Sequence, residues 1–294
     1  SNFGFTVLVI GAGAVIVAMM LSRRRTWASL AMAVWLLIAV VPLELVRPQK
    51  EIIVIFLTAV VLLTMRKLDK QYLALPAIAL LYLAYSYLGG RDYYFLITGA
   101  IFAIFALSNI GWPFRFVILL AVFCAGWLIP QDVLLSLSQT RNDLNVIRVL
   151  FPDMPGARTA FLNPLIGEDW LSFLGNYAYG ALRLNVPILF TPGISEAFLF
   201  FYCSSIFYLI AIGLRRSVEW QTRFSACAVA GHLVVLWLFD PDLGSYLRHV
   251  ASTTLYLMPI LNKLDRTSSG SVRQPSRLAG SSVVSMRTSD VSTA

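Results

Sequence analysis

The sequence predicts an all-α, polytopic transmembrane helical bundle of about nine spans, with an external cap of amphipathic helices. Of the 294 residues, 58% are hydrophobic and only 13% are charged, and the mean hydropathy is +0.75. Soluble domains carry roughly 25% charged residues. The apolar residues form long runs that short charged clusters separate. Runs of this kind match a hydrocarbon layer about 30 Å thick, so a membrane bundle is expected.

Nine apolar runs are the predicted spans. They are Phe5 to Leu21, Trp27 to Val46, Ile52 to Met65, Tyr72 to Leu88, Tyr93 to Leu107, Phe114 to Ile129, Glu196 to Gly213, Phe224 to Phe239, and Val250 to Leu261. Several are shorter than the roughly 20 residues that a helix needs to cross a bilayer, so we expect flanking turns to extend them. The last run is a candidate for a partly re-entrant segment. Because Arg23 to Arg25 follow the first run, we expect it to be a retained span and not a cleaved signal peptide.

Lys and Arg gather in alternate loops. They are Arg23 to Arg25, then Arg66, Lys67 and Lys70, then Arg215, Arg216 and Arg223, then Lys263 and Arg266. Short loops rich in positive charge stay on the cytoplasmic side of a membrane. This alternation predicts that the N-terminus lies outside and the C-terminus lies inside.

Four regions follow from the order of the runs. Residues 1–129 form a six-span region, 130–195 an external loop, 196–262 a three-span region, and 263–294 a Ser-rich cytoplasmic tail expected to be disordered. Within the loop, apolar residues recur at helical intervals from Asp132 to Phe151, and a second such piece runs from Glu168 to Leu184. We expect both to be amphipathic helices on the outer membrane surface, forming a cap over the bundle.

Composition argues against several other functions. The formal charge of +8 is distributed between apolar runs, so we expect no nucleic-acid partner. Cys124, Cys203 and Cys227 lie in apolar stretches without a C-x-x-C spacing, which favours buried free thiols over a metal or redox site. The stretch Val7 to Ala14 imitates a dinucleotide fingerprint, but Ile16 stands where the third glycine belongs. Small residues that let helices approach closely are the better interpretation, and no cofactor is expected.

Charged residues concentrate between apolar anchors of the external loop. They include Arg148, Arg158, Glu168, Asp169 and Arg183. Arginine holds phosphate oxygens in a bidentate manner, and such contacts are less screened near hydrocarbon than in water. An ordinary solvated loop with internal ion pairs explains the pattern equally well.

The last external turn also carries both carboxylates and cations. Asp240, Asp242, Arg248 and His249 lie within ten residues, and the position of the turn allows it to line one cavity with the long loop. We favour a functional site here over a turn shaped only by Pro and Gly, with Arg248 reaching the interface. For His232, inside a predicted span, we favour a packing role over a proton relay, because no acidic residue lies at helical spacing in that span.

The chain resembles the polytopic membrane proteins of bacterial surface-polysaccharide gene clusters, including Wzy-type repeat-unit polymerases. The motifs that carry the resemblance are Arg158-Thr159-Ala160-Phe161, Asn163-Pro164, and the turn with Asp242, Gly244, Arg248 and His249. Many spans and one long external loop late in the chain add to it. The resemblance covers mainly residues 130 to 262. This chain is shorter than those polymerases and has one large external loop where two are usual.

The resemblance implies a protein of the bacterial inner membrane that acts in exopolysaccharide, capsule or O-antigen synthesis without a metal or nucleotide. Its implied partners are membrane lipid, a polyprenyl-pyrophosphate-linked oligosaccharide and other polysaccharide-assembly proteins. The implied proton acceptors are Asp240, Asp242, Glu168 or Asp169, and the implied substrate-binding residues are Arg148, Arg158, Arg183, Arg248 and His249. Two other functions stay open: a transporter or flippase of a lipid-linked or polar solute, and a non-catalytic subunit of an assembly complex.

Overall fold

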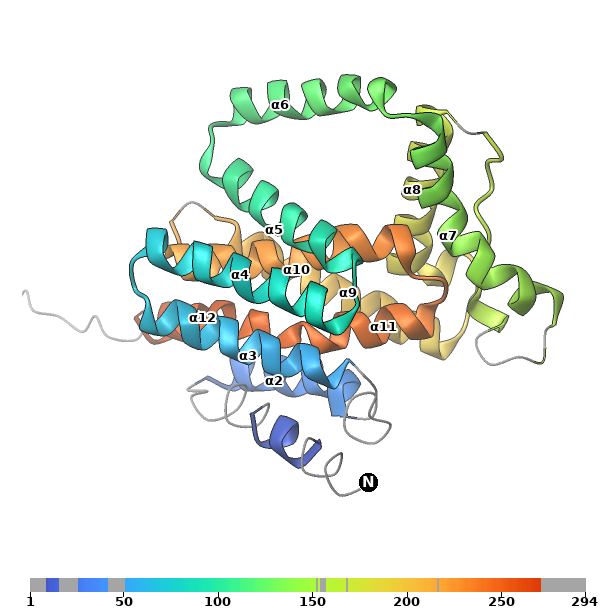
Figure 1. Ribbon diagram of the computed structural model, residues 1–294. Coiled ribbons are helices and arrows are strands. Elements are labelled where there is room, and N and C mark those ends of the chain that lie inside the picture. Colours follow the sequence, from blue (N-terminus) through green and yellow to red (C-terminus); the bar gives the residue numbers. More distant parts are fainter. Residues whose placement is uncertain are drawn as a thin grey trace, which may run out of the picture.

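The computed structural model of the protein describes residues 9–15, 26–41, 51–151, 153, 157–167, 169–215 and 217–270. In these residues all regular structure is helical, which confirms the all-α class (Figure 1). The α-helices are α2 (Trp27–Val40), α3 (Ile52–Lys67), α4 (Gln71–Gly89), α5 (Tyr93–Asn109), α6 (Trp112–Ala125), α7 (Gln131–Leu150), α8 (Trp170–Asn185), α9 (Ile194–Gly213), α10 (Trp220–Phe239), α11 (Leu243–Ser252) and α12 (Met258–Gly270). Short 3-10 turns lie between some of them: η2 (Gly126–Leu128), η3 (Ala157–Thr159), η4 (Pro187–Leu189) and η5 (Thr254–Leu257).

Three described helices, α4, α9 and α10, are long and apolar enough to cross a membrane. A fourth candidate arises if α6, η2 and α7 count as one span, although the chain bends by 99° between them. Helices α2 and α5 are apolar but shorter. The predicted spans from Tyr72, Glu196 and Phe224 therefore correspond to helices of spanning length, and the predicted span from Phe5 lies mostly outside the described residues.

The predicted span from Val250 to Leu261 is not one helix. Helix α11 ends at Ser252, η5 follows, and α12 then continues to Gly270, so residues 263–270 of the predicted tail are helical. The buried carboxylate of Asp265 explains why this segment is ordered. It accepts a 2.7 Å hydrogen bond from the hydroxyl of Thr26 and another hydrogen bond from Ser29, at the start of α2. Residues 271–294 lie outside the described part of the chain.

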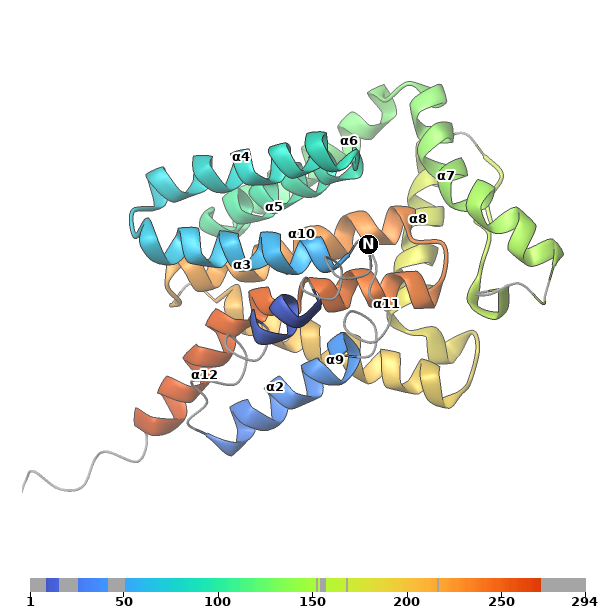
Figure 2. The ribbon, with the colours of Figure 1, turned by 60° about the horizontal axis from the view of Figure 1, so that its bottom comes forward.

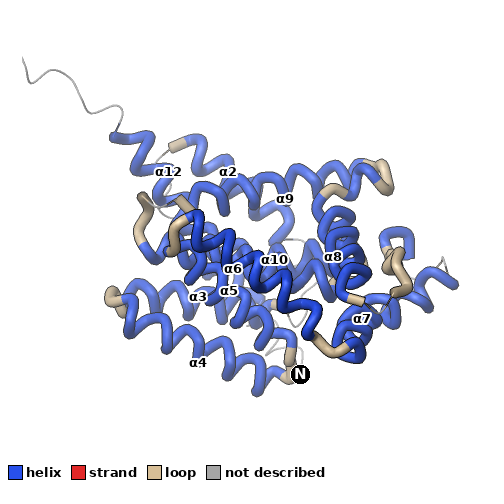
Figure 3. Tube along the Cα trace, turned by 90° about the horizontal axis from the view of Figure 1, so that it is seen from above, coloured by secondary structure: helices blue, strands red, loops and turns tan. Residues whose placement is uncertain are grey.

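Helix α10 occupies the centre of the bundle and packs against α5, α9, α8 and α12 (Figures 2 and 3). Small residues explain how closely α5 approaches it. A Cβ atom at Gly231 would lie 2.6 Å from the side chain of Ile101. Small residues at such contacts let membrane helices pack backbone to backbone.

Different polar contacts join the helices at the two ends of the bundle. At one end, Gln221 Nε2 donates to Met65 O across 3.2 Å, and Arg223 donates to Asn109 Oδ1 across 2.6 Å. At the other end, Arg91 lies beside Glu51 near the turn that follows α10. The ends of α3 and α5 thus meet the start of α10 at one end of the bundle, and the starts of α3 and α5 meet the end of α10 at the other.

Helices α6 and α7 form a bent arm beside the bundle. None of the residues of α6 is buried, and Figure 1 shows it standing apart from α5. This placement exposes Cys124, so the expectation of a buried thiol is wrong there, whereas Cys203 and Cys227 are buried. Beyond the bend, α7 packs against α8, and both contact α10. Both predicted amphipathic helices are therefore present as helices.

Candidate functional site

The candidate site is built around the turn that joins α10 to α11. Helix α10 ends at Phe239, and Pro241 follows in the turn, where its missing N–H prevents the helix from continuing. Asp242 then begins α11 as its N-cap. Its carboxylate accepts hydrogen bonds from Ser245 N at 2.9 Å and from Ser245 Oγ at 3.0 Å.

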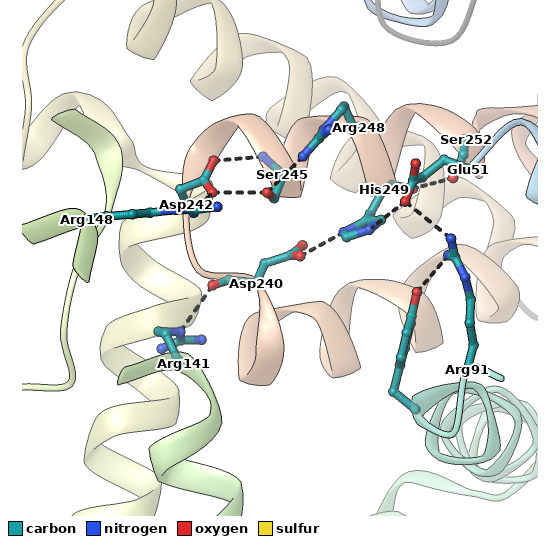
Figure 4. Close-up of polar contacts among 11 residues, drawn as sticks. Glu51, Arg91, Arg141, Arg148, Asp240, Asp242, Ser245, Arg248, His249 and Ser252 are labelled. Carbon is teal, nitrogen blue, oxygen red and sulfur yellow. Dashed lines mark hydrogen bonds and ion pairs between the residues drawn. The ribbon is translucent and has the colours of Figure 1, made fainter. Parts of the chain in front are cut away.

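His249, in the second turn of α11, lies between two carboxylates (Figure 4). Its Nδ1 is 2.7 Å from Asp240 Oδ1, and its Nε2 is 3.5 Å from Glu51 Oε1. Arg91 Nη2 approaches the same Glu51 oxygen at 3.4 Å. We call Glu51, Arg91, Asp240 and His249 the end cluster. It joins the start of α3, the loop before α5, and the α10–α11 turn.

Charges in the end cluster balance when His249 is protonated. Burial alone lowers the pKa of His249, but the charges and hydrogen bonds of Asp240 and Glu51 outweigh it and raise that pKa to about 9. Burial likewise raises the pKa of Glu51, but the hydrogen bond to His249 and the charges of His249 and Arg91 lower it to about 2. For Asp240, burial outweighs the neighbouring cation, and its pKa is raised.

The accessible part of this site is cationic. His249 exposes 24% of its side chain, whereas Glu51 and Asp240 expose 4% and 3%. Next to it, Arg148 pairs with Asp242 at 2.5 Å, and Arg248 donates to Ser245 Oγ at 3.0 Å (Figure 4). The site therefore presents Arg148, Arg248 and His249 in front of buried carboxylates. Such a surface suits a phosphate or another anion.

A buried arginine holds the turn in place. Arg141 of α7 is 1% exposed and donates to the backbone carbonyls of Asp240, at 3.1 Å, and Trp237. These carbonyls belong to the end of α10, where a helix leaves its last acceptors unpaired. Asn145, one turn along α7, donates to Pro241 O. Helix α7 thus fixes the end of α10 and the turn after it.

The structure brings five of the predicted site residues together and separates the others. Asp240, Asp242, Arg148, Arg248 and His249 share the site around the turn. Of the others, Asp169 caps α8 by accepting hydrogen bonds from Leu171 N and Ser172 N, and Arg158 pairs with Glu196 at the start of α9. The guanidinium of Arg183 lies over the rings of Phe161, Tyr179 and Phe190. Glu168 lies outside the described residues.

Two of the five have different surroundings from those expected of a base. Asp240 directs its carboxylate at His249, and Asp242 is engaged by Arg148 and Ser245. Sequence reasoning also missed Glu51, Arg91 and Arg141 as site residues. The sequence could have indicated Glu51 and Arg91, because both follow predicted spans and lie on the same predicted side of the membrane as the last external turn.

Within the described residues, no group of three or more His, Cys, Asp or Glu side chains has an arrangement that could hold a metal ion. Comparison of the chain with protein-family models, with curated proteins and with solved structures gives no match. We therefore base the proposed function on the site itself.

Proposed function

We propose that this chain is a nine-span protein of the bacterial inner membrane, with its N-terminus outside and its C-terminus inside, that polymerises lipid-linked sugar repeats for surface polysaccharide. The observation that supports this is the cationic surface of Arg148, Arg248 and His249 at one end of an apolar bundle. A polyprenyl pyrophosphate has the same two parts, an apolar chain in the membrane and charged oxygens at its surface.

The proposed reaction is glycosyl transfer. The acceptor hydroxyl oxygen forms a bond to the anomeric carbon, while the bond from that carbon to the pyrophosphate oxygen breaks. Arg148 and Arg248 offset the charge that develops on the departing pyrophosphate. The hydroxyl proton passes to the neutral form of His249 through Nε2, which lies 3.5 Å from Glu51 Oε1. Glu51 at Nε2 and Asp240 at Nδ1 stabilise the resulting imidazolium. Asp240 then acts as a positioning residue.

The role of His249 as base has a consequence for pH dependence. Because its pKa is about 9, the neutral form becomes more abundant as pH rises toward 9. The rate of glycosyl transfer should rise over this range and then level off. In a His249→Gln variant, that dependence should disappear together with most of the activity.

Cells that lack the protein provide the test. Deletion should leave single lipid-linked repeats without long polymer, and wild-type protein should restore the polymer. Arg148→Ala and His249→Gln should fail to restore it although they insert normally, whereas Arg115→Ala, on the exposed helix α6, should restore it. Unchanged polysaccharide in the deletion strain would refute the proposal.

A transporter of a lipid-linked or polar solute is the second candidate. A buried ionisable residue favours it, because His232 lies within α10, a helix of spanning length, and is only 2% exposed; such groups inside membrane helices often mark solute or proton pathways. Purified protein in liposomes separates the two candidates. Exchange of a lipid-linked oligosaccharide between leaflets without a longer product supports transport, and chain extension supports polymerisation.

A further inference from the structure

A line of buried polar side chains follows one face of the central helix α10. Thr222, Ser225, His232 and Asp240 are spaced so that they share one side of a helix with 3.6 residues per turn. Their exposures are 6%, 0%, 2% and 2%. Packing in a membrane does not require polar groups at these depths, where they are costly and commonly functional.

Three atoms on this face lack a hydrogen-bond partner among the described residues. They are Ser225 Oγ, His232 Nε2 and Asp240 Oδ2. Two atoms of α3 and its N-cap, Thr58 Oγ1 and Glu51 Oε2, share this property. An unsatisfied buried polar atom destabilises the folded state, so native proteins satisfy such atoms with ordered water or use them in function. Both α10 and α3 pack against η5, and five such atoms around it point to one common cause.

The surroundings of His232 define its protonation chemistry. Its Nδ1 lies 2.8 Å from Ala228 O, a distance that requires a proton on Nδ1 and leaves Nε2 as an acceptor. Three tyrosines surround the ring. The ring centroids of Tyr82, Tyr94 and Tyr256 are 5.8, 5.9 and 6.2 Å from that of His232, and they come from α4, α5 and η5. The hydroxyls of Tyr82 and Tyr256 lie 2.6 Å apart.

Tyrosine side chains also connect this histidine to the end cluster. Arg91 Nη1 donates to the Tyr93 hydroxyl across 2.9 Å, and the rings of Tyr93 and Tyr94 are 5.0 Å apart. Tyr94 in turn contacts His232. Along α10, the eight residues from His232 to Asp240 correspond to about 12 Å. One tyrosine hydroxyl and a few water molecules can bridge such a distance.

We propose that water bound along this face of α10 carries protons between the end cluster and His232, which makes His232 a proton-binding site inside the bundle. A proton adds to the lone pair of Nε2 and forms an imidazolium, while the Nδ1 proton stays with Ala228 O. The proton leaves again from Nε2. This assigns His232 a role other than the packing that its sequence context favours, and it does not depend on glycosyl transfer.

The two histidines of the chain allow a direct test. Protein with ¹⁵N-labelled histidine in lipid nanodiscs gives two imidazole signals, and His249→Gln assigns them. Magnetisation transfer from water should reach Nε2 of His232, and its resonance should move with pH as the imidazolium forms. Tyr94→Phe and Asp240→Asn should each slow the transfer about tenfold or more, which corresponds to an increase of about 1.4 kcal/mol in its activation free energy.

Tyr208→Phe, an exposed tyrosine on α9, is the matched control and should leave the transfer rate unchanged. A His232 signal that receives no transfer from water and stays fixed with pH overturns the proposal. Equal transfer rates in Tyr94→Phe, Asp240→Asn and Tyr208→Phe overturn it as well, because water would then reach His232 by another route.

Discussion

Arg141 Nε donates to the backbone carbonyl of Asp240 across 3.1 Å, although 99 residues separate the two in the sequence. The side chain of Asp240 meanwhile accepts from His249. Asp240 is therefore held through its backbone by α7 and through its carboxylate by α11.

Replacement of Arg141 by Met should lower the free energy of unfolding by about 3 kcal/mol, because the last carbonyls of α10 lose buried, charge-assisted hydrogen bonds. Chemical denaturation in detergent micelles measures this. Arg115→Met is the control, since Arg115 donates to Ser108 O and Ile110 O at the exposed end of α5. Equal losses in both variants would show that burial of Arg141 is unimportant.

Gly180→Ala should destabilise the protein through the same arginine. A Cβ atom there would lie 2.4 Å from Arg141 Nη1, and displacing this buried side chain should cost about 1–3 kcal/mol. Gly99 of α5 has open space around a Cβ atom, so Gly99→Ala should be neutral or slightly stabilising. Thermal unfolding of the two variants side by side tests this prediction, and a neutral Gly180→Ala would contradict it.

Stability should depend on pH through His249. Its pKa rises from the usual 6.5 to about 9 on folding, so the folded state binds its proton more tightly. The stabilisation, about 3 kcal/mol, is fully present below pH 6.5 and is lost as pH rises through 9. The difference in unfolding free energy between wild type and His249→Gln should shrink over this range. If this difference in unfolding free energy stays constant with pH, the carboxylates of the end cluster do not stabilise protonated His249.

Arg158→Met should reduce stability because it leaves the carboxylate of Glu196, with 1% of its side chain exposed, without its cation. Ser195 Oγ still donates to this carboxylate, and loss of the charge-assisted hydrogen bond from Arg158 costs about 1–3 kcal/mol. Glu196→Gln in the same chain should recover part of the loss, since a neutral amide is cheaper to bury. If Arg158 instead binds phosphate, as the resemblance implies, the double variant should be stable but inactive.

Sequence periodicity predicted the helical class and two amphipathic helices, at residues 132–151 and 168–184, because apolar spacing is a local property of the sequence. It also predicted that Asp240, Asp242 and His249 form one site, since a tight turn keeps them close. The contribution of Arg141 and Glu51 depends on packing between distant helices, which periodicity does not encode. Asp265 is a further example: its polar, Ser-rich neighbourhood predicts a disordered tail, whereas its buried carboxylate binds the start of α2, which is distant in the sequence.

The tie between Asp265 and the start of α2 has a consequence for biosynthesis. Helix α2 packs against α11 and α12, and its Trp35 donates to Ser205 of α9 across 3.1 Å. These partners are all translated late, at or after residue 194. At about 5–20 residues per second, α2 leaves the ribosome roughly 10 to 50 seconds before Asp265 does. During that interval the insertion machinery or a chaperone has to shield α2 until α12 arrives.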